Sequence, residues 1–396
     1  MILSKKMEAI EPSLTLKISA LSSRMKSEGM DVVGFGAGEP DFETPEYIKE
    51  AGKRAIDEGK TRYTAASGIL ELKQAACDRY FKKYGLKYTP DNAVISSGAK
   101  HSLYNVMQVL LNPGDEVIII NPYWLSYSEL VKMADGVPVF VDTREEDGFL
   151  PTAESIEAAV TGKTKALIIN SPSNPTGAVY GFELLKDIAA VCKKHGLAII
   201  SDEIYDELVY GNEIKSIACV DDETKALTKV VNGMSKAYAM TGWRIGYVLC
   251  DSRIASVMSS MQSNSTSNPC SIAQYASVAA LSDGEKEVEN MRRVFEHRRD
   301  IICSLIDDIP MLTCARPSGA FYALCSIKSA LGKSYNGKLI TDDIVFAELL
   351  LKEKLVAVVP GAPFGAPGYV RLSYACSEEN IRKGLGRIKE FCAAVE

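Results

Sequence analysis

The sequence predicts an α/β fold built around a mainly parallel sheet with helices on both faces. Seven short, nearly continuous apolar segments occupy residues 93–97, 116–121, 137–142, 165–170, 197–202, 229–233 and 245–250. Helical patterns separate most of them, for example over residues 102–111, 182–195 and 253–262. Strands that are apolar throughout and alternate with helices are typical of a parallel sheet that is buried on both faces.

The pattern changes after about residue 285, where a charged helix over 285–306 leads into shorter elements. Candidate strands follow at 312–315, 320–325, 356–360 and 369–373, with helices over 342–353 and from Ser377 onward. This order predicts a smaller α+β domain, and we expect residues 1–45 to pack against it. The predicted division is therefore a large domain at 46–285 and a small domain formed by 1–45 and 286–396, built from both chain ends.

Composition narrows the classes of function. The net charge is −6 and no block of five like charges occurs, which argues against a nucleic-acid partner. No apolar run reaches the roughly 18 to 20 residues of a membrane helix, and the first residues lack the apolar core of a secretory signal. The ten cysteines are scattered without a CxxC pair, which indicates reduced thiols in the cytoplasm. With three histidines, none beside a cysteine at ligand spacing, no metal site is expected.

Lys236 is flanked by small residues just after the predicted strand 229–233, and Arg244 follows eight positions later. Small neighbours let a bulky ring approach the backbone, and an arginine offers the planar geometry that a phosphate prefers. An amine is nucleophilic only when neutral, so such a lysine must be buried or lie near positive charge. The grouping suits a lysine joined to pyridoxal phosphate as a Schiff base, with Arg244 on the phosphate. The alternative is a solvated lysine in a Gly/Ser turn, the commonest setting of a lysine.

Three further features follow predicted strands, at the sheet edge where α/β proteins bind ligands. Gly98 and Ala99 open a helix, which favours an anion such as phosphate or is an ordinary turn. Asn174 lies in a rigid loop with two prolines, where its side chain could meet a cofactor's ring oxygen or serve the loop alone. Trp124 either stacks on an aromatic cofactor or packs in the core.

Two charged residues lie in apolar strands. Asp202 ends 197–202, where a carboxylate is costly unless paired. A protonated pyridine nitrogen is a fitting partner, because the pair makes the ring an electron sink; a helix cap is the alternative. Tyr205 is close enough in sequence to reach the ring hydroxyl. Arg371, in 369–373, requires an anion, either a substrate carboxylate or an internal salt bridge. Gly38 lies in a turn whose backbone could approach a substrate.

Together and in this order, these motifs resemble the class I aminotransferases of fold type I, which depend on pyridoxal 5′-phosphate, and most closely the bacterial aspartate aminotransferase subgroup. The resemblance runs essentially from Lys6 to the C-terminal helix. It implies a seven-stranded large domain. It also implies cofactor-binding roles for Tyr63, Gly98, Ala99, Trp124, Asn174, Asp202, Tyr205, Ser235, Lys236 and Arg244, and substrate-binding roles for Thr15, Gly38, Lys100, Trp124, Asn174 and Arg371.

Some of these roles are specific to the resemblance. Tyr63 matches a tyrosine that such dimers lend to the neighbouring subunit's phosphate, so a homodimer with composite active sites is expected. Arg371 would take the α-carboxylate, while Lys100 matches a lysine that meets the distal carboxylate of acidic substrates and Thr15 matches a second contact there. Ala99 replaces the usual hydroxyl or glycine, so its phosphate contact would come from the backbone alone.

The expected reaction is transamination between L-aspartate and 2-oxoglutarate, giving oxaloacetate and L-glutamate, with Lys236 as catalytic residue. Relatives acting on prephenate, or on aromatic and neutral amino acids, share the scaffold, and prephenate is itself a dicarboxylic oxo acid. A transaminase of that kind is therefore an alternative, and a β-lyase using the same cofactor is another, because a fold does not fix its chemistry.

Overall fold

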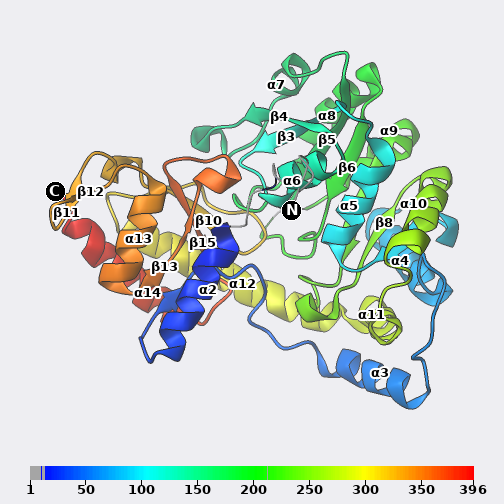
Figure 1. Cartoon of the computed structure of the whole chain (residues 1–396), viewed down its shortest axis with the longest axis horizontal. Coiled ribbons are helices and arrows are strands. Elements are labelled where there is room, and N and C mark those ends of the chain that lie inside the picture. The colour runs from blue at the N-terminus through cyan, green and yellow to red at the C-terminus, as the bar shows by residue number, and fades with distance from the viewer. Residues whose placement is uncertain (1–9, 11–13, 212) are drawn as a thin grey trace, which may run out of the picture.

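The computed structural model describes residue 10, residues 14–211 and residues 213–396, without the side chains of 14–19 and 23. Its largest element is a seven-stranded sheet (Figure 1). The strand order is β2 (Ala93–Ser96), β8 (Gly246–Leu249), β7 (Thr228–Gly233), β6 (Ala198–Asp202), β5 (Thr164–Asn170), β3 (Glu116–Asn121) and β4 (Val137–Asp142). Only β8 runs antiparallel to its neighbours among these strands. The predicted mainly parallel α/β sheet is confirmed, and each predicted strand agrees within one residue at either end.

The inner strands are largely apolar because alternate side chains enter different cores. Ile168 and Ile200 pack with residues of α5 (Ala99–Leu110), α6 (Ser126–Met133) and α10 (Ser252–Ser265). Their neighbours Leu167 and Ile199 pack on the other face with α7 (Ala153–Ala158) and α8 (Phe182–His195). A third core joins the β2 edge to α3 (Glu46–Asp57), α4 (Leu70–Tyr84) and α11 (Ser271–Asp283). The short helix α9 (Asp222–Leu227) leads into β7.

The C-terminal part has its own antiparallel sheet, in the order β14 (Val359–Pro360), β15 (Tyr369–Ser373), β10 (Tyr322–Ser326) and β9 (Thr313–Cys314). Its core includes residues of α12 (Glu285–Asp307), α13 (Asp343–Lys354) and α14 (Glu378–Ala393). A hairpin of β11 (Ser334–Tyr335) and β12 (Lys338–Leu339) lies near the C-terminus.

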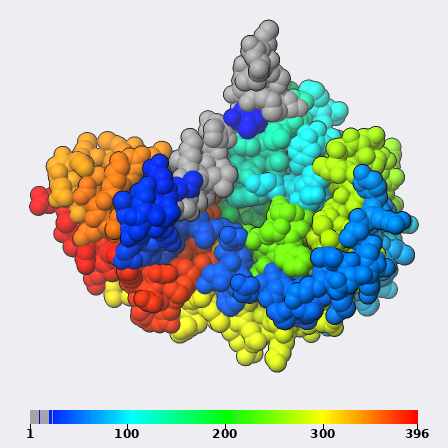
Figure 2. Space-filling view, turned by 60° about the horizontal axis from the view of Figure 1, so that its bottom comes forward, coloured from blue at the N-terminus to red at the C-terminus, as the bar shows by residue number. Residues whose placement is uncertain are grey.

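The N-terminal segment lies against this C-terminal part. Strand β1 (Val33–Gly34) pairs in parallel with β13 (Val356–Ala357). Leu21 and Met25 of α2 (Leu14–Ser27) pack with Leu351 and Ala357, and Figure 2 shows the blue N-terminal residues beside the orange and red C-terminal ones. The domain boundaries near 45 and 285 stay predictions.

No helix in the described part of the chain has both the length and the apolar character needed to cross a bilayer. Among the same residues, no group of three or more His, Cys, Asp and Glu side chains is arranged to hold a metal ion. All ten cysteines are unpaired thiols.

Candidate active site

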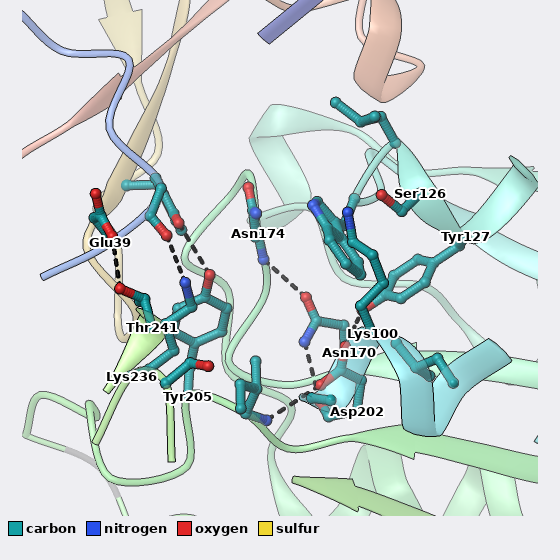
Figure 3. Close-up of a pocket in the computed structure, with 18 of the residues that line it drawn as sticks. Glu39, Lys100, Ser126, Tyr127, Asn170, Asn174, Asp202, Tyr205, Lys236 and Thr241 are labelled. Carbon is teal, nitrogen blue, oxygen red and sulfur yellow. Dashed lines mark hydrogen bonds between the residues drawn. The ribbon is translucent and has the colours of Figure 1, made fainter. Parts of the chain in front are cut away.

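A cavity of about 400 Å³ lies at the carboxyl edge of the seven-stranded sheet. Asn170 ends β5 and Asp202 ends β6, in direct register with each other, and both line the cavity. Of the fourteen residues predicted for the site, eleven line it: Gly38, Ala99, Lys100, Trp124, Asn174, Asp202, Tyr205, Ser235, Lys236, Arg244 and Arg371. In the view of Figure 3, Lys236 and Tyr205 lie on one side and Lys100 and Tyr127 on the other.

Lys236 follows β7 by three residues and is half-buried. Its ammonium donates a 2.5 Å hydrogen bond to the Gly38 carbonyl. Burial lowers the pKa of Lys236 to about 8; Arg371 and Arg244 act in the same direction, while Glu39 and Asp202 oppose the shift. The amine is therefore much closer to its neutral, nucleophilic form at neutral pH than a solvated lysine is.

Asp202 is 3% exposed. Its carboxylate accepts hydrogen bonds from the Tyr127 hydroxyl at 2.6 Å and from the Ile204 N–H at 3.2 Å. Burial raises the pKa of Asp202 to about 6, against the opposing effects of Tyr127, the Ile204 N–H and Lys236. The residues after Asp202 form turns rather than a helix, so the helix-cap alternative is wrong.

A chain of amides joins Asp202 to Arg371, and Figure 3 shows its links from Asp202 through Asn170 to Asn174. The Asn170 Nδ2 donates to the Asp202 main-chain oxygen at 3.0 Å, and the Asn170 Oδ1 accepts from the Asn174 N–H at 2.9 Å. The Asn174 Oδ1 then accepts from Arg371 Nη1 at 3.0 Å. These contacts fix the loop after β5 between the two charged groups.

Arg371 is fully buried in β15, and burial lowers the pKa of its guanidinium. Besides Asn174, it donates to the Gly36 carbonyl at 3.1 Å and stacks 4.4 Å from the Tyr322 ring. Its Nε has no hydrogen-bond partner, and none of the carboxylates in the described residues forms an ion pair with it. The internal salt bridge is therefore ruled out for these residues, and a buried cation on an open cavity suits an anionic ligand.

Gly98 lies behind Arg244 rather than on the cavity wall. It precedes α5 with φ +90°, and a Cβ there would lie 2.3 Å from Arg244 Nη2. Arg244 Nη1 donates to the Thr241 carbonyl at 2.9 Å. The missing side chain thus lets the guanidinium approach the N-terminus of α5, where backbone N–H groups favour an anion.

Two aromatic residues complete the walls. Lys100 holds its ammonium 4.8 Å from the centre of the Trp124 ring, and burial and Arg244 lower the pKa of Lys100. The Tyr205 hydroxyl shares a 2.9 Å hydrogen bond with that of Tyr322.

Tyr63, like Gly98, is predicted for the site but does not line the cavity of its own chain. Tyr63 is 89% exposed and lies apart from the lining residues of its own chain. Thr15 belongs to α2, but its side chain lies outside the described part.

Other lining residues were not predicted from the sequence, among them Glu39, Tyr127, Asn170 and Tyr322. Asn170 had a usable signal, because it ends a predicted strand beside the one that ends in Asp202. Tyr127 lies three positions after Trp124, a spacing that places both on one side of a helical turn. Tyr322 comes from the distant β10, and nothing local to its sequence indicates the contact.

The residues present fit pyridoxal phosphate. A buried carboxylate suits a protonated ring nitrogen, and a lysine of lowered pKa suits the aldehyde. Arg244 and the N-terminus of α5, which come together because Gly98 has no Cβ, suit the phosphate.

The sequence matches the family described as “Aminotransferase class I and II” over residues 30–388. It is 47% identical over 395 residues to the aspartate aminotransferase of Geobacillus stearothermophilus, covering 100% of both chains. It is 46% identical to the aspartate/prephenate aminotransferase of Cereibacter sphaeroides, covering 99% of each. The solved Thermus thermophilus aspartate aminotransferase with maleate has a TM-score of 0.94 and 43% identity, over 99% of this chain and 100% of that one. The chain therefore belongs to the class I and II aminotransferases, and it is a pyridoxal-phosphate-dependent transaminase.

Proposed function

We propose that this transaminase moves the amino group of L-aspartate to 2-oxoglutarate, releasing oxaloacetate and L-glutamate. The observation that carries the proposal is one cavity that brings together Lys236, Asp202 and Arg371. A nucleophilic amine, a buried carboxylate and an arginine with a free donor are what a bound cofactor and an amino acid require.

We expect the cofactor to be held mainly by residues that line the cavity. Asp202 would hold a proton on the ring nitrogen, Asn174 and Tyr205 would hold the ring oxygen, and Trp124 would stack on the ring. The phosphate would be held by Arg244, Ser235 and the backbone of Gly98 and Ala99. Pyridoxal phosphate supplies an aldehyde carbon that takes up the amino group and a ring that accepts the electrons of the broken C–H bond.

Lys236 moves the proton. Its neutral Nζ takes the α-proton of the bound amino acid as general base and returns it as general acid. The lowered pKa of about 8 supports this, since a fully solvated lysine is almost entirely protonated at neutral pH and cannot accept a proton. Help of this kind is typically worth about 10² to 10⁴ in rate.

The substrate would be held at both ends. Arg371 would bind the α-carboxylate through the Nε that has no partner among the described residues, and Lys100 would meet the distal carboxylate of an acidic substrate. The resemblance adds Thr15 as a second contact for that carboxylate. The Thermus relative was solved with maleate, which is a dicarboxylate. We expect Lys100→Ala to lower kcat/KM for aspartate and glutamate far more than for alanine or phenylalanine; equal losses on all four would contradict this role.

Prephenate is the second candidate amino acceptor. It is favoured by the Cereibacter relative named aspartate/prephenate aminotransferase, 46% identical to this chain. Prephenate carries two carboxylates, so Arg371 and Lys100 suit it as well. Assays with 2-oxoglutarate and with prephenate as amino acceptor show whether the enzyme accepts the first alone or both.

We further propose a homodimer with composite sites, located in the cytoplasm. The exposed Tyr63, which is apart from its own cavity, suits a residue that reaches a partner's phosphate. The ten unpaired cysteines suit a reducing compartment.

The direct test is the aspartate/2-oxoglutarate reaction of the purified protein with pyridoxal phosphate. Lys236→Ala should lose at least about 10²-fold in turnover, whereas Lys53→Ala, at an exposed surface pair, should retain it. Near-native turnover by Lys236→Ala would refute the assignment. Pyruvate and ammonia released from a cysteine conjugate without any oxo acid would instead favour a β-lyase.

A further inference from the structure

Tyr127 lines the cavity, but no step of the proposed reaction uses it. It lies in the first turn of α6, 2% exposed, and its ring meets Trp124 edge-on with centroids 5.4 Å apart. Its ring also belongs to the core beneath α6, with Ile119 and Leu130. The body of the side chain is therefore fixed by packing, and only the hydroxyl is directed to a polar group.

That polar group is Asp202. The 2.6 Å hydrogen bond from Tyr127 is the single side-chain hydrogen bond to this carboxylate among the described residues, and the other oxygen takes only the longer bond from the Ile204 N–H. Burial, with the Asp202 carboxylate beside it, raises the pKa of the Tyr127 phenol well above its usual range, so the phenol stays a donor. Hydrogen bonding to the charged form of a carboxyl favours that form.

The other groups that face Asp202 do not replace this donor. Lys236, which follows β7, lowers the pKa of Asp202 through its positive charge alone. Its ammonium donates its hydrogen bond to the Gly38 carbonyl. Tyr205, in the turn after β6, is bonded to Tyr322, and the Asn170 amide of β5 meets the main chain of Asp202 rather than its carboxylate.

We propose that Tyr127 is a positioning residue for the cofactor, because its hydroxyl orients the Asp202 carboxylate and holds it in the ionised form that pairs with the ring nitrogen. The inference rests on the proposed pairing of Asp202 with that nitrogen. It assigns to this chain's own Tyr127 the task of setting the pH below which the pair fails.

The test uses the apoenzyme and the dissociation constant of pyridoxal phosphate, measured by tryptophan fluorescence between about pH 5 and 9. A protonated Asp202 cannot pair with a protonated ring nitrogen, so affinity should fall on the acid side. In Tyr127→Phe the fall should begin at a pH higher by about one unit, the tenfold change expected when a charged group loses one hydrogen bond. Replacement Tyr127→3-fluorotyrosine, a stronger donor of nearly the same shape, should move the fall to lower pH.

Tyr84→Phe is the matched control. The Tyr84 hydroxyl also donates to a buried aspartate, Asp206, at 3.1 Å, and Asp206 does not line the cavity. Both Tyr→Phe variants lose one such bond, so their thermal unfolding separates a general loss of stability from an effect on Asp202.

The outcomes are distinct. If Asp202→Asn removes the acid-side fall while Tyr127→Phe and the fluorinated variant leave it at the wild-type pH, the role of Tyr127 is overturned and the proposed function stands. If Asp202→Asn leaves the profile unchanged, the pairing itself fails and the inference fails with it. Opposite shifts in the two Tyr127 variants, absent in Tyr84→Phe, support the proposal.

Discussion

Replacing Gly98 by alanine should weaken cofactor binding with little effect on the rest of the fold. The new Cβ would lie 2.3 Å from Arg244 Nη2 and 2.8 Å from its Cζ, so the guanidinium must retreat by about 0.7 Å to reach even 3.0 Å. The backbone at φ +90° and ψ 159° is in addition one that alanine adopts at a cost of about 1–3 kcal/mol. A displaced arginine loses a charge-assisted contact with phosphate worth about 1.5–3 kcal/mol, or roughly 10- to 100-fold in affinity.

The assay is the dissociation constant of pyridoxal phosphate for the apoenzyme, with urea denaturation to measure the free energy of unfolding. Gly85→Ala is the control, because Gly85 also has positive φ (+72°) but a Cβ there meets nothing within 4 Å. It should lower stability and leave the affinity unchanged. An unchanged affinity in Gly98→Ala would refute the claim that this glycine makes room for Arg244.

Two further predictions concern buried charge. Asp206→Ala removes the buried 2.7 Å partner of Arg79, which keeps its 2.6 Å contact with Glu207, and should lower the free energy of unfolding by about 1.5–3 kcal/mol in urea. Glu50→Ala, which removes an exposed pair with Lys53, should cost less than about 1 kcal/mol, and equal losses in the two variants would contradict the reasoning. In the apoenzyme, the pKa of Lys236 lies near 8 when folded and returns to 10.5 on unfolding, so the unfolded state binds more protons between these values. The stability of the wild type relative to Lys236→Met should therefore rise with pH over that window, and a flat difference would contradict the lowered pKa.

The sheet was predictable because its inner strands are apolar over most of their length. β5 and β6 are buried on both faces, so each reads as a continuous run that no exposed strand would show. Asp202 stands out for the same reason, as a charge at the end of such a run. Local sequence motifs were enough to predict Lys236, Arg244 and Asn174.

Contacts between distant segments could not be predicted in this way. The register of β5 and β6 places Asn170 beside Asp202, and the crossing from α6 to β6 brings in Tyr127, 75 positions away. Tyr322 reaches Tyr205 over 117 positions. The spacing of apolar residues along the chain does not predict these contacts, because they depend on how the strands and domains are arranged in space. Tyr63 differs from these residues. The resemblance predicts a role for it, but that role would be in the active site of a second chain.

The proposed chemistry requires the amine of Lys236 to be bonded to the aldehyde carbon of pyridoxal phosphate. Borohydride reduction of the holoenzyme, followed by peptide mapping, tests this most directly. We expect a single pyridoxyl label on the peptide that contains Lys236. A label on another lysine, or no label on a protein that has bound the cofactor, would contradict it.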